Sequence, residues 1–282
     1  MSIKIKNLSH IYSKGTPFEK IALDNINLDI EYGEFVGIIG HTGSGKSSLV
    51  QHLNALLKPS SGSIYIDDQD IFADKSKLKS LRSKVGLVFQ YPEHQLFELT
   101  ILKDVCFGPL NMGLSKEESE NRAKNALELV GINSKLFEKS PFELSGGQKR
   151  RVAIAGVLAM NPKILILDEP TAGLDPKGRD EILNQIKIMH KTLGITVILV
   201  SHSMEDISKL ASKIFVINNG KIALEGSPKE IFSKIDELEN IGLSSTQAAY
   251  LIRELKENGF DLPSGIYSVD DAVNSILNYF KK

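Results

Sequence analysis

One short stretch decides the fold class of this chain: Gly40-His41-Thr42-Gly43-Ser44-Gly45-Lys46-Ser47. It lies between an apolar run over residues 35–39, typical of a strand, and a helical pattern over residues 46–57. Glycines let backbone N–H groups curl around phosphate oxygens, and the N-terminus of the following helix adds positive potential. In such a loop the lysine reaches the outer phosphates and the Ser47 hydroxyl ligates Mg²⁺. The stretch predicts a nucleoside triphosphate site; a plain glycine-rich turn is the alternative.

A second motif supplies acidic groups. Residues 164–167 indicate a buried strand that ends in Asp168 and Glu169, at the edge where α/β sheets bind ligands. We expect Asp168 to hold the Mg²⁺ shell and Glu169 to polarise the attacking water. A solvated acidic strand end is the alternative, but the phosphate loop upstream favours catalysis.

The rest of the pattern indicates an α/β core with two additions. Strands are predicted at residues 3–5, 26–30, 63–66, 85–89, 196–200 and 214–217. Helices are predicted between several of them, at residues 177–193 and 204–211. The stretch from Thr100 to Leu158 carries helical patterns, including residues 116–130, and no convincing strand, so it is predicted to be a helical insert.

The chain changes character after Asn218-Asn219-Gly220, which predicts a hairpin turn between residues 214–217 and 221–224. From about Ser227 the pattern is helical. Apolar residues share one helical face between Ala248 and Leu255, with Gly259 as a stop, and another between Ala272 and Phe280. These features predict a small C-terminal helical extension.

A second glycine-containing turn, Leu144-Ser145-Gly146-Gly147-Gln148, precedes a helical run over residues 149–160. Ser145 could simply cap that helix. Alternatively, the free N–H groups at the start of that helix bind phosphate. A fold that already has one phosphate loop does not need a second phosphate-binding turn for its own nucleotide. The surplus makes sense if this turn completes the pocket of a neighbouring subunit, with ATP sandwiched in a dimer.

Composition limits the possible environments. The chain has 282 residues, of which 41% are hydrophobic and 24% charged, and no apolar run approaches the roughly 20 residues that cross a bilayer. The net charge of -1 argues against a surface built for nucleic acid. A single cysteine, Cys106, and an N-terminus without a signal-peptide pattern favour the cytosol. If the protein works at a membrane, we expect it to do so from outside the lipid.

Taken in order, these motifs resemble those of the ATP-binding-cassette ATPases. The resemblance covers about residues 3–230 and implies a P-loop NTPase domain of α/β class with an antiparallel β subdomain and a helical subdomain at about residues 100–158. Residues 231–282 then form the C-terminal helical extension.

The resemblance also implies roles for single residues. Tyr12 would stack on adenine, Gln90 would contact Mg²⁺ or the lytic water, and His202 would grip the γ-phosphate, so that Glu169, His202 and Gln90 form the catalytic set. Structural roles in the core, at a strand end or beside a helix cap are the alternatives for Tyr12, Gln90 and His202. The implied Mg²⁺ ligands are Ser47, Gln90 and Asp168. The implied ATP-binding residues are Tyr12, Gly40, His41, Thr42, Gly43, Ser44, Gly45, Lys46, Ser47, Ser48, Ser145, Gly146, Gly147, Gln148 and Asp175.

A narrower resemblance is carried by Phe89-Gln90-Tyr91-Pro92-Glu93-His94-Gln95-Leu96-Phe97 and by Asp104-Val105-Cys106-Phe107-Gly108-Pro109. Both segments look like those of energy-coupling factor transporters, which import vitamins and metal ions, and of related cobalt importers. The motifs are similar to the second of the two paralogous ATPases that pair in this group, although Ser48 replaces the usual threonine and Ala172-Gly173 the usual Ser-Ala.

The narrower resemblance implies partners. They are a paralogous ATPase subunit in a heterodimer, or a second copy in a homodimer, a transmembrane coupling subunit near Gln90, and indirectly a substrate-binding membrane subunit. The chain would then be a peripheral protein on the cytoplasmic face of the cell membrane. Leu96 and Phe97 would offer the coupling subunit an apolar floor, with Glu93 and Glu98 either pairing with its basic side chains or simply solvated.

Two other functions compete with transport. A DNA-maintenance ATPase of the same fold usually carries coiled coils or zinc modules, and the chain has neither sustained heptads nor cysteine pairs. A P-loop kinase would leave the turn at residues 144–148 and His202 without a role.

Overall fold

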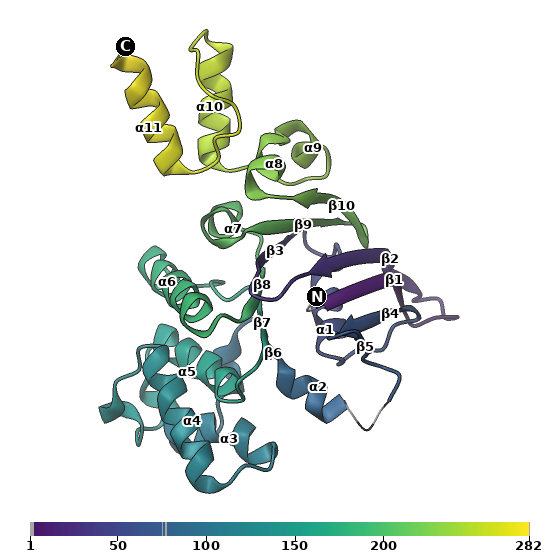
Figure 1. Ribbon diagram of the computed structural model, residues 1–282, viewed down its shortest axis with the longest axis vertical. Helices are drawn as coiled ribbons and strands as arrows, with labels where there is room; N and C mark the ends of the chain where they lie inside the picture. Colours follow the sequence, from purple (N-terminus) through teal and green to yellow (C-terminus); the bar gives the residue numbers. More distant parts are fainter. Residues whose placement is uncertain (1–2, 75, 77, 282) are drawn as a thin grey trace.

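The computed structural model describes residues 3–74, 76 and 78–281, which form two β-sheets with helices around them (Figure 1). The smaller sheet is antiparallel and has the order β2-β1-β4-β5. In it Ile3 pairs with both Ile30 and Ile66, and all three are buried. Its strands are β1 (Ile3–Tyr12), β2 (Lys20–Ile30), β4 (Ser61–Ile66) and β5 (Gln69–Asp70).

The larger sheet has the order β10-β9-β3-β8-β7-β6. Its strands are parallel apart from the β9–β10 hairpin, which confirms the predicted turn. Every residue of β3, β7 and β8 is buried, as expected for parallel strands covered on both faces. The strands are β3 (Phe35–Ile39), β6 (Val85–Val88), β7 (Ile164–Asp168), β8 (Thr196–Val200), β9 (Lys213–Asn218) and β10 (Lys221–Gly226).

Helices cover both faces of the larger sheet. Helix α1 (Lys46–Leu53) shares an apolar core with the smaller sheet and one face of the larger one. On the opposite face, α6 (Pro176–Leu193) and α7 (Met204–Leu210) pack into a second core, as Figure 1 shows. The phosphate loop therefore starts at the carboxyl end of a central strand, between two packed layers.

The span from Thr100 to Leu158 is helical, as predicted, and contains no strand. It holds α3 (Ile101–Asn111), α4 (Lys116–Leu129), η3 (Ser134–Leu136), η4 (Pro141–Glu143) and α5 (Gly146–Leu158). These helices form the lower end of the molecule in Figure 1 and join the core through α5 and β6. Two short helices precede them, α2 (Leu78–Lys84) and η2 (Pro92–Gln95).

The C-terminal part lies at the opposite end of the molecule, where its first helix packs against the β9–β10 hairpin and only its last two helices extend away from the sheets (Figure 1). It contains α8 (Pro228–Ser233), α9 (Ile235–Asn240), α10 (Gln247–Glu257) and α11 (Val269–Phe280), so the predicted C-terminal helices are confirmed. Gly259 follows α10 with a φ of 89°, a value that glycine adopts without strain. Helices α10 and α11 share a small core of their own.

Several predicted bounds are wrong. The helix predicted at residues 46–57 ends at Leu53, because Asn54 bonds to the Val85 carbonyl and Ala55 takes a left-handed backbone, φ 54°. The strand predicted at residues 85–89 stops at Val88, whereas the one predicted at residues 3–5 continues to Tyr12. Strand β5 and helix α2 were not predicted.

Candidate functional site

The loop between β3 and α1 is tightly wound. Gly43 and Gly45 have φ of 81° and 114°, a region that residues with a Cβ rarely adopt. A Cβ on Gly40 would lie 2.4 Å from a carbonyl oxygen of β9. Lys46 Nζ donates hydrogen bonds to the carbonyls of Gly40 and His41, at 2.7 and 3.0 Å. Among the described residues no side chain caps α1, so its first N–H groups can meet phosphate oxygens.

An acidic pair and the P-loop lysine interact at the carboxyl end of β7. Burial raises the pKa of Asp168, as does the charge of Glu169, while a hydrogen bond to Ser47 and the charge of Lys46 oppose that rise. Burial lowers the pKa of Lys46, against the attraction of the two carboxylates. A divalent cation would stabilise the charged form of Asp168. Ser47 and Asp168 offer oxygen ligands, which Mg²⁺ prefers, so these residues fit that ion.

Glu169 and His202 form a pair beside this group. Glu169 Oε2 accepts a hydrogen bond from His202 Nδ1 at 2.8 Å. The glutamate side chain is 13% exposed and the histidine side chain 74% exposed. The imidazole is thus held at one nitrogen and open to solvent at the other. The structure therefore brings together two residues of the predicted catalytic set.

A buried carboxylate that sequence reasoning missed lies behind this pair. Asp206, 1% exposed, accepts hydrogen bonds from Arg179 Nε at 2.7 Å and from Thr171 Oγ1 at 3.0 Å. Arg179 also donates to the Ser203 hydroxyl. The network joins the loop that follows the catalytic glutamate to the loop of the histidine. Its only sequence signal was an aspartate next to Ile207, on the buried side of a short helix.

A cavity of about 180 Å³ opens beside the phosphate loop, lined by Tyr12, Lys46, Ser47 and Ser48 among others. The Tyr12 hydroxyl is 3.1 Å from Ser48 Oγ. Tyr12 is 37% exposed, so part of its surface is available to a ligand. The structure thus places six of the predicted ATP-binding residues around one cavity: Tyr12, Gly43, Gly45, Lys46, Ser47 and Ser48.

The second glycine-containing turn lies elsewhere. Ser145 begins α5 in a capping box: its hydroxyl accepts from Gln148 N at 3.3 Å, and Gln148 Oε1 accepts from Ser145 N at 3.0 Å. A Cβ on Gly146 or Gly147 would meet no atom within 4 Å among the described residues, so packing within the chain does not require glycine there. None of these four residues lines the cavity at Tyr12. The turn faces outward.

The remaining predicted residues make fewer contacts with the rest of the predicted site. Gln90 is exposed just after β6, and within the described part of the chain no hydrogen bond joins it to another predicted site residue. Asp175 Oδ1 accepts from Gly178 N at 2.8 Å and so caps α6, a structural role that the sequence analysis did not consider. Thr42 is exposed, and the Ser44 hydroxyl is buried without a partner among the described residues.

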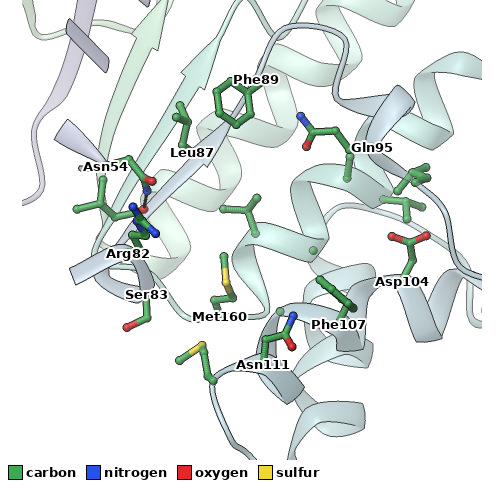
Figure 2. A pocket seen from close by; sticks show the side chains of 18 of the residues that line it. Asn54, Arg82, Ser83, Leu87, Phe89, Gln95, Asp104, Phe107, Asn111 and Met160 are labelled. Atoms are coloured by element: carbon green, nitrogen blue, oxygen red, sulfur yellow. Dashed lines mark hydrogen bonds between the residues drawn. The ribbon is translucent and has the colours of Figure 1, made fainter. Parts of the chain in front are cut away.

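A groove of about 520 Å³ separates the sheet core from the helices α3 and α5. Figure 2 shows Phe89 and Leu87 on its sheet side, with Gln95, Phe107 and Met160 across from them. Phe97 also lines it and is 58% exposed, whereas Leu96 is buried. An apolar groove is therefore present, but of the two residues expected to form its floor only Phe97 is exposed.

Glu93 was expected at the rim of this groove, either paired with basic side chains of a partner or simply solvated. The structure shows a third arrangement. Glu93 is neither solvated nor available to a partner, because it forms an ion pair with Arg150 at 2.8 Å inside the chain. Partial burial alone would raise the pKa of Glu93, but the hydrogen bonds and charge of Arg150 hold it below its ordinary value. Sequence reasoning missed Arg150, because it stands between Lys149 and Arg151 and nothing in that polar run distinguishes it from its neighbours.

The phosphate loop on a central parallel strand, the acidic end of β7 and the two-sheet architecture define an ATP-binding-cassette ATPase. Among residues 3–74, 76 and 78–281, no helix is long and apolar enough to cross a membrane.

Comparisons with known proteins agree. Residues 23–172 match the model of the ABC transporter family. The chain is 58% identical over 281 residues to the energy-coupling factor transporter ATP-binding protein EcfA2 of Clostridium tetani, covering 99% of this chain and 98% of the relative. It is 60% identical over 278 residues to the EcfA2 of Clostridium acetobutylicum, covering 98% and 97%.

Two solved structures extend the comparison. CbiO1 of Clostridium perfringens, described as part of the ABC transporter complex CbiONQ, superposes with a TM-score of 0.76 at 42% identity, over 90% of this chain and 98% of that one. The ATP-binding cassette MJ0796, solved as a dimer in a post-hydrolysis state with ADP and Pi, gives 0.71 at 35% identity, over 80% and 98%.

The chain belongs to the ABC transporter family, among the ATP-binding subunits of energy-coupling factor transporters. The predicted fold class and the predicted function as an ATP-binding, ATP-hydrolysing transporter subunit are thereby confirmed.

Proposed function

We propose that this chain binds ATP together with Mg²⁺ between the phosphate loop and Tyr12, and that Glu169 activates the water that cleaves the γ-phosphate. The observation that carries the proposal is the hydrogen-bonded Glu169–His202 pair at the carboxyl end of β7, beside Lys46 and Asp168. Tyr12 stacks on the adenine ring, and the wound loop donates its N–H groups to the phosphates.

The acidic residues divide the chemistry between them. Asp168, with Ser47 and Gln90, would hold Mg²⁺, which neutralises charge on the phosphate oxygens when bound. Glu169 is fixed by its backbone bond to Val200 and by His202, so its carboxylate accepts a proton from a water placed in line with the γ-phosphate. Donation from His202 Nε2 to the same phosphate requires the imidazolium form, because Nδ1 already carries the proton that Glu169 accepts.

The turn at Ser145 serves a second subunit. Because its glycines satisfy no packing requirement inside the described chain, we infer that Ser145, Gly146, Gly147 and Gln148 close over ATP bound to a partner ATPase, with Asp175 at the same interface. The partner is a paralogue, or a second copy of this chain.

The groove at Phe97 receives a transmembrane coupling subunit. An amphipathic helix can bury its apolar side in such a groove, next to Gln90. The substrate-binding membrane subunit is reached only through that partner, and the chain works as a peripheral protein on the cytoplasmic face of the membrane, where it powers the uptake of vitamins or metal ions. Residues 3–230 form the ATPase domain, with its helical subdomain at about residues 100–158, and residues 231–282 the extension.

Glu169→Gln tests the proposal. The amide keeps the shape of the side chain but cannot take the proton, so turnover should fall by about 10²–10⁴ while ATP affinity is retained. Steady-state phosphate release by the complex, with both ATPase subunits mutated, measures this. Glu117→Gln, the same change at an exposed position of α4, is the matched control. Phosphate release near the wild-type rate would contradict the assignment.

A further inference from the structure

Arg150 joins its own helix to two segments that are distant in the sequence. Its side chain, on α5, is 2% exposed. Nε and Nη2 donate to the two carboxylate oxygens of Glu93, at 3.1 and 2.8 Å. Nη1 donates to the carbonyl oxygens of Pro170 and Ala172, both at 2.8 Å. One guanidinium thus joins η2, α5 and the loop that follows Glu169.

Each segment that Arg150 reaches carries a strained residue. Tyr91, two positions before Glu93, has a φ of 56°, and Glu169, one position before Pro170, has a φ of 51°. A left-handed backbone is unfavourable for residues with a Cβ, so it persists only where surrounding contacts hold it. The hydrogen bonds of Arg150 lie next to both strained positions and supply such contacts.

A second observation shows that the two segments lie close together. A Cβ added to Gly173 would lie 3.5 Å from the ring of Tyr91, an ordinary van der Waals distance. The loop after Glu169 therefore packs against the start of η2. Displacing one of the segments would disturb the other directly as well as through Arg150.

The same elements border the groove. Gln95, at the end of η2, and Phe97 line it on one side, and Val152 and Val157 of α5 line its floor. Figure 2 shows Gln95 at the groove edge. An occupant of the groove would thus press on the two elements that Arg150 ties to the loop of the catalytic glutamate.

We infer that Arg150 is a positioning residue that transmits occupancy of the groove to Glu169, with Glu93 as its link to the groove side. The inference rests on the proposed function, in which a membrane subunit fills the groove and Glu169 activates water. Two sets of hydrogen bonds from one guanidinium then have different roles. The bonds of Nε and Nη2 to Glu93 couple docking to hydrolysis, and the bonds of Nη1 to the two carbonyl oxygens hold the conformation of the loop that follows Glu169.

The two sets of hydrogen bonds can be separated by mutation. Glu93→Gln weakens the link to η2 but leaves both carbonyl bonds, so it should lower the substrate transported per ATP hydrolysed at least twofold, with kcat and KM for ATP within twofold of wild type. Arg150→Met removes both sets, and kcat should also fall, at least tenfold, at unchanged KM. Glu118→Gln and Arg122→Met alter a similar ion pair, also 2.8 Å long, on the surface of α4 and should change nothing.

These measurements use the purified transporter complex in vesicles, with transport and phosphate release recorded together. A merely structural role would lower transport and hydrolysis in the same proportion, since both scale with the folded fraction. An unchanged ratio in Glu93→Gln and Arg150→Met would therefore overturn the inference.

Hydrogen exchange on the isolated chain tests, independently of ATP turnover, whether Arg150 links η2 to the loop that follows Glu169. Arg150→Met should speed exchange in residues 91–97 and 170–175, and Glu93→Gln in residues 91–97 first. Faster exchange confined to α5 would overturn the inference. A wild-type complex that releases no phosphate would instead contradict the proposed function, while the exchange result would still show whether Arg150 joins the segments.

Discussion

His202 Nδ1 and Glu169 Oε2 lie 2.8 Å apart, although the residues are 33 positions apart in the chain. Adjacent parallel strands β7 and β8 bring their loops to the same sheet edge, because parallel strands end on the same side. The carboxylate can only accept, so Nδ1 carries a proton, and Nε2 is left for another partner. The pair therefore orients both residues at once.

His202→Ala should remove this orientation while leaving the phosphate loop intact. We expect ATP affinity to change by less than about threefold and phosphate release to fall by about 10² or more, since a positioned proton-transfer group contributes on that scale. Lys191→Ala, at an exposed position in the last turn of α6, serves as the control. Turnover near wild type in His202→Ala would show that Glu169 needs no such partner.

Ser145→Arg should separate ATP binding from dimer closure. The turn does not line the cavity at Tyr12, so the isolated subunit should bind ATP with near wild-type affinity. The long cationic side chain should enter the partner's phosphate site and block formation of the ATP-dependent dimer. Size-exclusion chromatography measures this dimer in subunits that also carry Glu169→Gln, so that ATP is not hydrolysed during the run.

Ser115→Arg provides a matched control, because Ser115 is also an exposed N-cap, at the start of α4. Both changes lose a cap worth about 1 kcal/mol, but only Ser145→Arg should prevent dimerisation. Loss of ATP binding by the isolated Ser145→Arg subunit would place the turn in the chain's own pocket.

Phe97→Ser should weaken attachment to the membrane subunit. The Phe97 ring lines the groove and meets Phe107 edge-on at 5.0 Å. Burying a phenylalanine contributes about 1.5–3 kcal/mol, which corresponds to roughly 10- to 100-fold in affinity. Leu96 is unsuitable for this test because it is buried, and its truncation would destabilise the core itself.

The nearby Leu99 gives the control for that experiment. It is 77% exposed and is not among the residues that line the groove. Leu99→Ser should leave copurification with the membrane subunit unchanged, and both variants should keep ATP affinity. Equal copurification of Phe97→Ser and wild type would mean that the partner docks on another surface.

The parts of the site that sequence reasoning predicted are those with local causes. The phosphate loop needs left-handed glycines at Gly43 and Gly45, and a strand and a helix must flank it, all within twenty residues. The acidic strand end at Asp168 and the cap at Ser145 are similarly local. Each is visible as a short pattern.

The parts that sequence reasoning missed depend on distant contacts. Glu93 looked like a surface charge because its partner, Arg150, is 57 residues away. The end of α1 was misplaced because Asn54 bonds to Val85, which belongs to a strand 31 residues further along. Residue spacing along one element carries no information about either contact.

A buried histidine pair next to Tyr12 makes a prediction about pH. His52 is fully buried, and its Nδ1 is 2.7 Å from the carbonyl oxygen of Ser48, so Nδ1 must donate. His10 Nδ1 lies 3.2 Å from both the Lys58 carbonyl oxygen and His52 Nε2, so it donates and the two atoms share its proton. The His10 ring in turn meets Tyr12 edge-on, with centroids 4.5 Å apart. The neutral form of His52 satisfies every one of these contacts.

Protonating His52 should therefore destabilise the fold. Burial lowers the pKa of His52 from 6.5, and the neighbouring His10 lowers it further, while hydrogen bonds to the backbone of Ser48 and Lys58 oppose the change. Because the native pKa is below the unfolded one, the unfolded chain binds more protons as the pH falls below about 6.5. Stability is fully present above that value and declines by up to about 1.4 kcal/mol for each pH unit below it, until the native pKa is reached.

His52→Gln isolates this effect, because its amide can still bond to His10 but does not titrate. We expect the variant to be less stable than wild type at pH 8, where a well-packed neutral imidazole is replaced, and the difference to shrink at pH 5.5, where only the wild type bears the protonation penalty. Urea unfolding at the two pH values measures the free energies directly, and carboxylates that titrate in both proteins cancel in the comparison. Since Tyr12 rests on His10, ATP affinity of the wild type should also weaken on acidification more than that of the variant. A stability difference that is the same at both pH values would show that His52 does not titrate in this range.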